Sequence, residues 1–136
     1  MILSAHTDGA SKCNPGPAAI GYTIENDSVI IEEFFEYIGE TTNNVAEYKA
    51  IIAVLKRMKT LGGRNITLFS DSELAVKQIT GRYRVKNPGL KPLYDEVMSL
   101  SHEFDSFRIT HVPRGHNSRA DGLANKALKI SRKSDG

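Results

Sequence analysis

The stretch ILSAHTDGASKCNPGPAAIGYTI, residues 2–24, sets the start of the fold. Residues 2–8 alternate in side-chain character and stop at Asp8-Gly9, which predicts a strand that ends there. The segment NPGP, residues 14–17, is a strong turn signal, so the apolar run that follows it predicts a second strand. A polar break after that run and a further apolar run indicate a hairpin. The chain therefore opens with three strands.

The rest of the chain alternates between strand and helix signals. Short apolar runs predict strands, and apolar residues at helical spacing predict helices. The expected elements after the second strand are a strand over 29–38, a helix from about 43 to 58, a strand over 66–69, a helix from 72 to about 79, a helix over 90–104, a strand over 107–112 and a helix from about 119 to 130. A hairpin followed by helical crossovers predicts an α/β fold, with helices packed on a mixed sheet.

Length and composition exclude several classes of protein. A chain of 136 residues suits a single domain, which we expect over residues 1–131 with a frayed tail over 132–136. Apolar runs fall well short of the roughly 20 residues that span a bilayer, so we expect no membrane partner. The start does not resemble a secretory signal, and one cysteine, Cys13, fits a reducing compartment. These features predict a cytoplasmic protein.

The net charge of +2 is too small to demonstrate nucleic-acid binding by itself. One stretch does concentrate positive charge without an intervening acid, and it contains Lys77, Arg82, Arg84, Lys86 and Lys91. Such a stretch attracts phosphates, although a solvated basic face serves solubility equally well.

Four acids stand beside apolar patterns: Asp8, Glu47, Asp71 and Asp121. Taken singly each is explained by a helix cap or a surface charge, except Glu47, which interrupts the apolar face of its helix. A buried, unpaired carboxylate strongly disfavours folding, so four that converge make physical sense only if cations neutralise them. If the first and fourth strands are parallel neighbours, their carboxyl ends place Asp8 and Asp71 at one crevice. The sequence thus predicts a metal site.

Four segments also carry a resemblance to a known family, in the order TDGASKCNPGPAAIGY, TTNNVAEYKAIIAVL, SDSELAVKQI and GHNSRADGLAN. Through them nearly the whole chain resembles type 1 ribonuclease H. The resemblance implies the RNase H-like fold, a five-stranded mixed sheet in the order 3-2-1-4-5 with helices on both faces. It also implies an endonuclease that cuts the RNA strand of RNA/DNA hybrids with Mg²⁺, or Mn²⁺ in its place, leaving 5′-phosphate and 3′-hydroxyl ends.

The resemblance assigns expected roles to individual residues. Two cations about 4 Å apart would clamp the scissile phosphate. Asp8 would bridge both ions, with Glu47 and Asp71 completing one site and Asp121 the other. His116 would transfer a proton to the leaving group, and a loop histidine without a role is the alternative.

Substrate contacts follow from the same motifs, to the minor groove and the backbone of a hybrid. The expected contact residues are Asn14, Thr42, Asn43, Asn44 and Glu73. For the asparagines and the threonine, turn and cap chemistry is an alternative that does not exclude substrate contact. Glu73 stands where many relatives have a glutamine.

Two other functions compete with a ribonuclease H that acts as a monomer on hybrids. One is a catalytically weak or silent nucleic-acid-binding module on the same fold. The other is a different nuclease or strand-transfer enzyme of that fold, such as a resolvase or transposase core. The presence of all four acids argues against the first, and the full set of motifs argues against the second.

Overall fold

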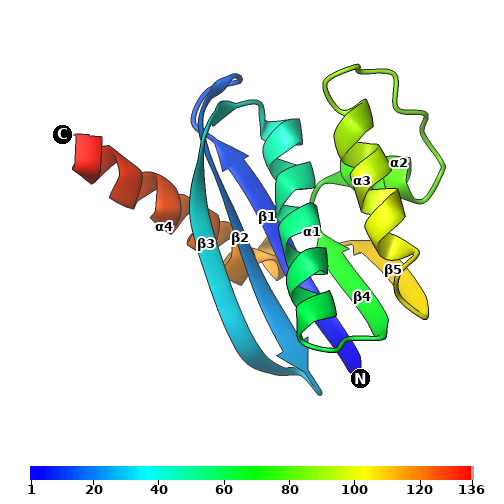
Figure 1. Ribbon diagram of the computed structural model, residues 1–136. Helices are drawn as coiled ribbons and strands as arrows, with labels where there is room; N and C mark the ends of the chain where they lie inside the picture. The colour runs from blue at the N-terminus through cyan, green and yellow to red at the C-terminus, as the bar shows by residue number, and fades with distance from the viewer. Residues whose placement is uncertain (136) are drawn as a thin grey trace.

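The computed structural model describes residues 1–135, with side-chain environments described through residue 131. Its elements, in chain order, are β1 (Ile2–Ser11), β2 (Gly16–Asn26), β3 (Val29–Thr41), α1 (Asn43–Thr60), β4 (Asn65–Ser70), α2 (Glu73–Ile79), α3 (Lys91–Ser101), β5 (Ser106–His111), the 3₁₀ turn η1 (Arg114–His116) and α4 (Ser118–Asp135). The predicted order of strands and helices is confirmed (Figure 1).

The five strands form one mixed sheet in the order β3-β2-β1-β4-β5, as the sequence predicts. β1 pairs antiparallel with β2, and β2 antiparallel with β3. β4 lies parallel to both β1 and β5. In the predicted hairpin, Asp27 and Ser28 have φ of 52° and 66°, which suits the type I′ turn that joins twisted strands. The chain therefore reverses tightly between β2 and β3.

Strand β1 continues beyond its predicted end at Asp8. Its parallel pairing with β4 stops at Thr7 opposite Ser70, but its antiparallel pairing with β2 continues to Ser11 opposite Ala18. The predicted strand end was wrong because Asp8-Gly9 ends the pairing of β1 with β4 and not its pairing with β2. Asp8 consequently lies inside a strand, at the point where the neighbouring strand β4 turns away.

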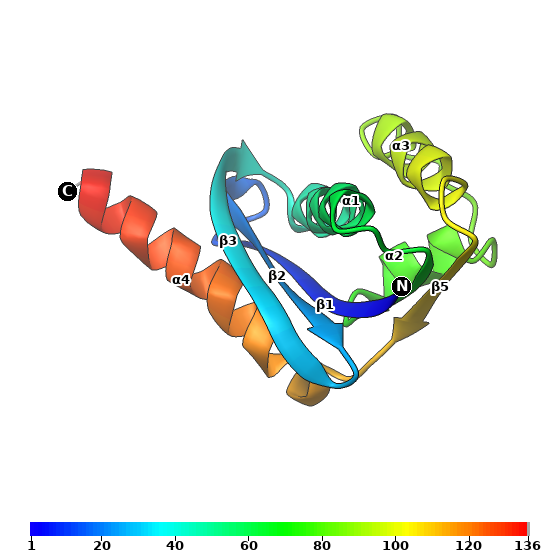
Figure 2. The same cartoon turned by 60° about the horizontal axis from the view of Figure 1, so that its bottom comes forward.

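Helices cover both faces of the sheet. α1 packs against β1 and β2 with α3 beside it, while α4 packs against β1, β2 and β3 from the other side (Figure 2). α1 begins at the cap residue Thr42, whose hydroxyl accepts from the Val45 amide at 3.2 Å, so the predicted cap segment is confirmed. α1 buries nine of its residues, and one of them, Glu47, is charged.

Two predicted helix boundaries differ from the structure. α3 ends at Ser101, and Phe104 reaches the core from the turn that follows, so its apolar character extended the helical pattern too far. α4 continues to Asp135 instead of ending near Ile130. The expected frayed tail over 132–136 stays a prediction, and its last residue lies outside the described part.

Across residues 1–135, no helix is long and apolar enough to cross a membrane.

Candidate metal centre

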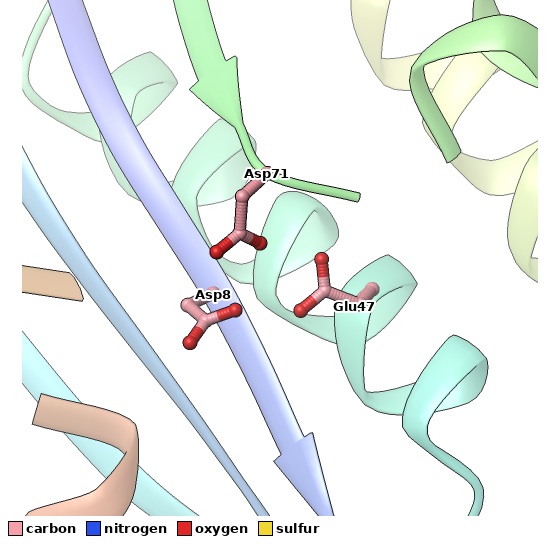
Figure 3. Close-up of side chains that lie close together, drawn as sticks. All are labelled: Asp8, Glu47 and Asp71. Carbon is pink, nitrogen blue, oxygen red and sulfur yellow. The ribbon is translucent and has the colours of Figure 1, made fainter. Parts of the chain in front are cut away.

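Three acidic side chains from separate elements meet at one edge of the sheet. Asp8 comes from β1, Glu47 from α1 and Asp71 from the residue after β4, and their carboxylates point toward one another (Figure 3). Each offers a ligand oxygen, and these oxygens all lie within 4.8 Å of one another. Asp8 is 4% exposed and Glu47 3%. Such an oxygen-rich cluster has the donor set that hard divalent cations take.

The cluster is electrostatically strained when no cation is bound. Burial, followed by the neighbouring Glu47 carboxylate, raises the pKa of Asp8 far above the usual range of an aspartate. Burial also raises the pKa of Glu47, to about 7. Both shifts have the direction expected when like charges share a poorly solvated site. A cation among these carboxylates would relieve the repulsion, so the residues present fit a metal ion.

Gly9 holds Glu47 in place, a role that the sequence analysis missed. The Gly9 amide donates to Glu47 Oε1 at 2.5 Å, a buried contact that favours the ionised carboxylate. A Cβ on Gly9 would lie 2.2 Å from the carbonyl carbon of Ala46, so only glycine lets β1 approach α1 this closely. The Asp-Gly pair had been interpreted as a strand end, which hid this contact.

Asp121 approaches the cluster from the other face of the sheet. It lies in the first turn of α4, and its side chain contributes to the raised pKa of Asp8. Its Oδ1 is buried and has no hydrogen-bond partner within the described part of the chain, and it lies 3.9 Å from the Arg114 guanidinium. The start of α4 is fixed by Asn117, a buried side chain whose Nδ2 donates to the Thr7 carbonyl at 2.8 Å. The three-acid cluster itself does not include Asp121.

Comparison with known proteins supplies the family. A family model described as reverse transcriptase-like matches residues 6–127. The ribonuclease HI of Halobacterium salinarum is 46% identical over 93% of this chain. The solved structure of RNase H1 from the same archaeon superposes with a TM-score of 0.93 at 44% identity, covering 96% of this chain and 99% of that one. The chain belongs to the ribonuclease HI family.

Other relatives extend the comparison. LC11-RNase H1, solved in complex with an RNA/DNA hybrid, is 38% identical with a TM-score of 0.91, covering 95% of this chain and 98% of that one. The chain spans 64% of the length of the curated Halobacterium relative and 37% of that of curated mycobacterial relatives.

The other predicted site residues lie at different distances from the acids. Asn43 lines the cavity of about 270 Å³ that the three acids open into, together with Ser72 and Arg114. The side chain of Asn14 accepts from the Asn43 amide at 3.0 Å, which joins the turn after β1 to the start of α1. Asn44 is half-buried beside them. Asn43 thus borders the acid cavity, and Asn14 and Asn44 adjoin Asn43; we call these three residues the asparagine rim.

Two predicted residues lie away from the acid cavity. Glu73 lines a separate cavity with Lys77, whose ammonium it binds at 2.5 Å, and this contact lowers the pKa of Glu73. His116 also lines another cavity, on the side of α4, whereas Arg114 of the same 3₁₀ turn faces the acids. The sequence did not single out Arg114, because a loop arginine has no distinguishing pattern.

Without bound metal, the protein is expected to lose stability as the pH rises. Between the ordinary value of 4.5 and about 7, folded Glu47 binds its proton more tightly than the unfolded chain does. The contribution of Glu47 to the free energy of unfolding therefore falls across that window. The raised pKa of Asp8 continues the fall at higher pH. Urea unfolding in EDTA at stepped pH measures the slope. Glu47→Gln should make the slope between pH 4.5 and about 7 shallower, whereas the exposed control Glu40→Gln should leave it unchanged. Equal slopes in both variants would contradict the expectation.

Repulsion among the clustered carboxylates should also lower the free energy of unfolding of the metal-free protein. Asp8→Asn should raise the free energy of unfolding in EDTA by roughly 0.5–2 kcal/mol, as relief of strain at functional sites commonly does. Mg²⁺ should then stabilise the variant less than the original protein, because a ligand stabilises only the state that binds it.

Proposed function

We propose that this chain hydrolyses the RNA strand of RNA/DNA hybrids with divalent cations, Mg²⁺ or alternatively Mn²⁺, leaving 5′-phosphate and 3′-hydroxyl ends. The observation that carries the proposal is the convergence of Asp8, Glu47 and Asp71 within 4.8 Å, from three elements of the fold. The hybrid bound to LC11-RNase H1, a relative 38% identical, supports the choice of substrate.

Four carboxylates would hold the cations. Asp8 interacts with Glu47, Asp71 and Asp121, so it is the side chain best placed to be shared between two ions. Glu47 and Asp71 would complete one site, and Asp121 the other. When bound, such ions stabilise charge on the scissile phosphate and acidify an attacking water. The protein's own contribution is to hold these carboxylates in fixed positions, through the Gly9 amide and the packing of α1.

The asparagine rim would contact the substrate. Amides both donate and accept, which suits 2′-hydroxyls and base edges in the shallow groove of a hybrid. Asn14, Asn43 and Asn44 lie at the junction of the first turn and α1, next to the acids. We assign Thr42 to a phosphate of the DNA strand, in addition to its role as a cap. Glu73 would accept from a 2′-hydroxyl after leaving Lys77.

A cleavage assay tests the proposal directly. A labelled RNA/DNA hybrid, the matching DNA duplex and the matching RNA duplex are incubated with the protein in Mg²⁺ and in excess EDTA. We expect cleavage of the hybrid's RNA strand in Mg²⁺ alone. Equal cutting of the DNA duplex, or full activity in EDTA, would overturn the proposed function.

We further propose that the enzyme acts as a monomer in the cytoplasm. All four acids come from one chain, so the centre needs no second subunit. The sole cysteine, Cys13, is free and exposed, which suits a reducing compartment.

His116 is expected to contribute about 10²-fold to the rate, at the lower end of general acid–base catalysis. It follows β5 in the loop that leads to Asp121, and the assigned role requires a rotation of this loop that carries the imidazole from its present cavity to the leaving group. His116→Ala should lower kcat much more than it raises KM, as steady-state kinetics on a hybrid would measure. His111→Ala, an exposed histidine on β5, is the matched control. An unchanged kcat in His116→Ala would remove the assigned role.

Hybrid binding is expected to depend only weakly on salt. Among the residues that line the acid cavity, Arg114 is the one basic residue. The exposed cations of residues 82–86 follow α2 and lie outside that lining. Few phosphate contacts give a slope of log affinity against log salt of about −2 to −4. Changing both Arg82 and Arg84 to alanine should weaken binding and flatten the slope, while Arg64→Ala, paired with Asp105, should not. A slope near −8, or no effect of the double change, would contradict this assignment.

A further inference from the structure

His6 and Glu25 form a fixed pair on β1 and β2, outside the three-acid cluster. Nδ1 of His6 lies 2.5 Å from Oε1 of Glu25. Thr23 donates its hydroxyl to the same oxygen at 3.1 Å, and the His6 ring stacks on Phe69 with centroids 4.8 Å apart. These contacts hold the imidazole in one orientation and leave Nε2 as the ring nitrogen not used by Glu25.

The Glu25 carboxylate is only partly satisfied. The residue is 8% exposed, and Oε2 is buried without a hydrogen bond among the described residues. Both donors that reach this carboxylate go to Oε1. The nearby guanidinium of Arg119 does not compensate, because it is bound to Glu33. A buried carboxylate left in this state favours additional positive charge close by.

A cavity of about 300 Å³ brings a second imidazole to this pair. Its walls include His6, Glu25 and His116, with Asn117 and Ser118 at the start of α4. None of its lining residues lines the acid cavity. His116 is exposed on the short turn η1, so its ring is free to turn into the cavity. The cavity therefore contains two imidazoles, one of them already oriented by a carboxylate.

This arrangement has the chemistry of a transition-metal site. A histidine that ligates a metal usually gives its other ring N–H to a carboxylate, which fixes the tautomer and strengthens the ligand. Imidazole suits Zn²⁺, Ni²⁺ and Cu²⁺, whereas all-carboxylate clusters suit Mg²⁺ and Mn²⁺. We propose that His6 and His116 form a second cation site, selective for a Zn²⁺-class ion, in which Glu25 orients His6 and solvent completes the coordination.

Occupation of this site would regulate the reaction, a consequence that rests on the proposed function. His116 is the residue assigned to proton transfer, and a metal bound between His116 and His6 would keep its ring on the α4 side of the sheet. The Zn²⁺-bound protein would therefore cleave hybrid slowly even with Mg²⁺ present.

Calorimetric titration of Zn²⁺ into the full chain tests the site itself. The protein used for every titration carries the substitution Asp71→Asn, so that Zn²⁺ binding by the three-acid cluster is weakened. We expect one saturable site, which is lost with His6→Gln or with His116→Gln. Glu25→Gln should weaken it by about 10- to 100-fold, as loss of an orienting partner does. The exposed control His111→Gln should bind as before. Absence of saturable binding, or unchanged affinity in both His6→Gln and His116→Gln, would overturn the proposal.

Cleavage assays test whether Zn²⁺ bound at this site inhibits the reaction, which is a separate question from whether the site binds Zn²⁺. With all acids intact and Mg²⁺ present, Zn²⁺ should slow hybrid cleavage, and His6→Gln should relieve that inhibition. Equal inhibition of the original protein and His6→Gln would overturn the regulatory role. A protein that never cleaves hybrid would refute the proposed function, while the calorimetric result would still decide whether the site exists.

Discussion

Replacing Asp71 by asparagine is expected to lower hybrid cleavage by at least about 10³-fold, the scale on which loss of a charge-stabilising group at a reacting centre acts. Asp71 is the member of the three-acid cluster that is partly exposed to the cavity. The amide keeps its size but loses the negative charge that a cation needs. Hybrid binding should remain measurable, because the asparagine rim and the basic segment are untouched. Single-turnover cleavage and a separate binding titration measure the two effects.

Asp95→Asn is the matched control for this experiment. Asp95 lies exposed on α3 and forms an ion pair with Lys91, so its change removes the same charge far from the cavity. Its cleavage rate should match that of the original protein. If Asp71→Asn retained more than about a tenth of the activity, a factor worth only 1.4 kcal/mol, the cluster would not be the catalytic centre.

Gly9→Ala is expected to lower the free energy of unfolding by about 3 kcal/mol or more, at the upper end of overpacking effects. The new Cβ would lie 2.2 Å from the Ala46 carbonyl carbon and 2.3 Å from the Glu47 amide nitrogen. Backbone atoms of a packed helix cannot turn aside as a flexible side chain does, so α1 must move away from β1. That movement carries Glu47 away from Asp8, and cleavage by the folded fraction should fall as well.

Gly122→Ala is the control for the added methyl group. Apart from its chain neighbours and the adjoining backbone of α4, no heavy atom of the described residues lies within 4 Å of the Cβ position at Gly122. Alanine there should stabilise the protein by about 0.5–1 kcal/mol, the usual gain over glycine in a helix. Denaturant unfolding compares both variants with the original protein. A Gly9→Ala protein as stable as Gly122→Ala would show that β1 and α1 tolerate separation.

Local patterns predicted the elements and the acids because each leaves a signal within a few residues. Glu47 was recognisable as a charge on an apolar helix face, and its burial is confirmed. The convergence of Asp8 and Asp71 followed from the expected parallel pairing of β1 and β4, which the structure also confirms. The substrate and proton-transfer roles of the remaining residues stay predictions.

Contacts between distant segments left no such signal. The Gly9 amide reaches Glu47 across 38 positions, and the Asn117 side chain reaches Thr7 across 110. Neither glycine nor asparagine differs locally from a turn residue, so their roles depend on tertiary packing alone. The positions of the side chains of η1 also depend on tertiary packing. Arg114 lines the cavity of the acids, whereas His116 lines the cavity that contains His6.

The approach of α4 to the sheet has a consequence for the order of events during synthesis. Asp121 comes last of the four acids in the chain, and its helix closes on β2 so tightly that a Cβ at Gly21 would meet the Ala120 carbonyl at 2.7 Å. On a nascent chain the segments that supply Asp8, Glu47 and Asp71 are therefore synthesised before α4. On the proposed function, a chain in which α4 has not yet docked holds three acids and cuts nothing, so cleavage begins only when the last helix is in place.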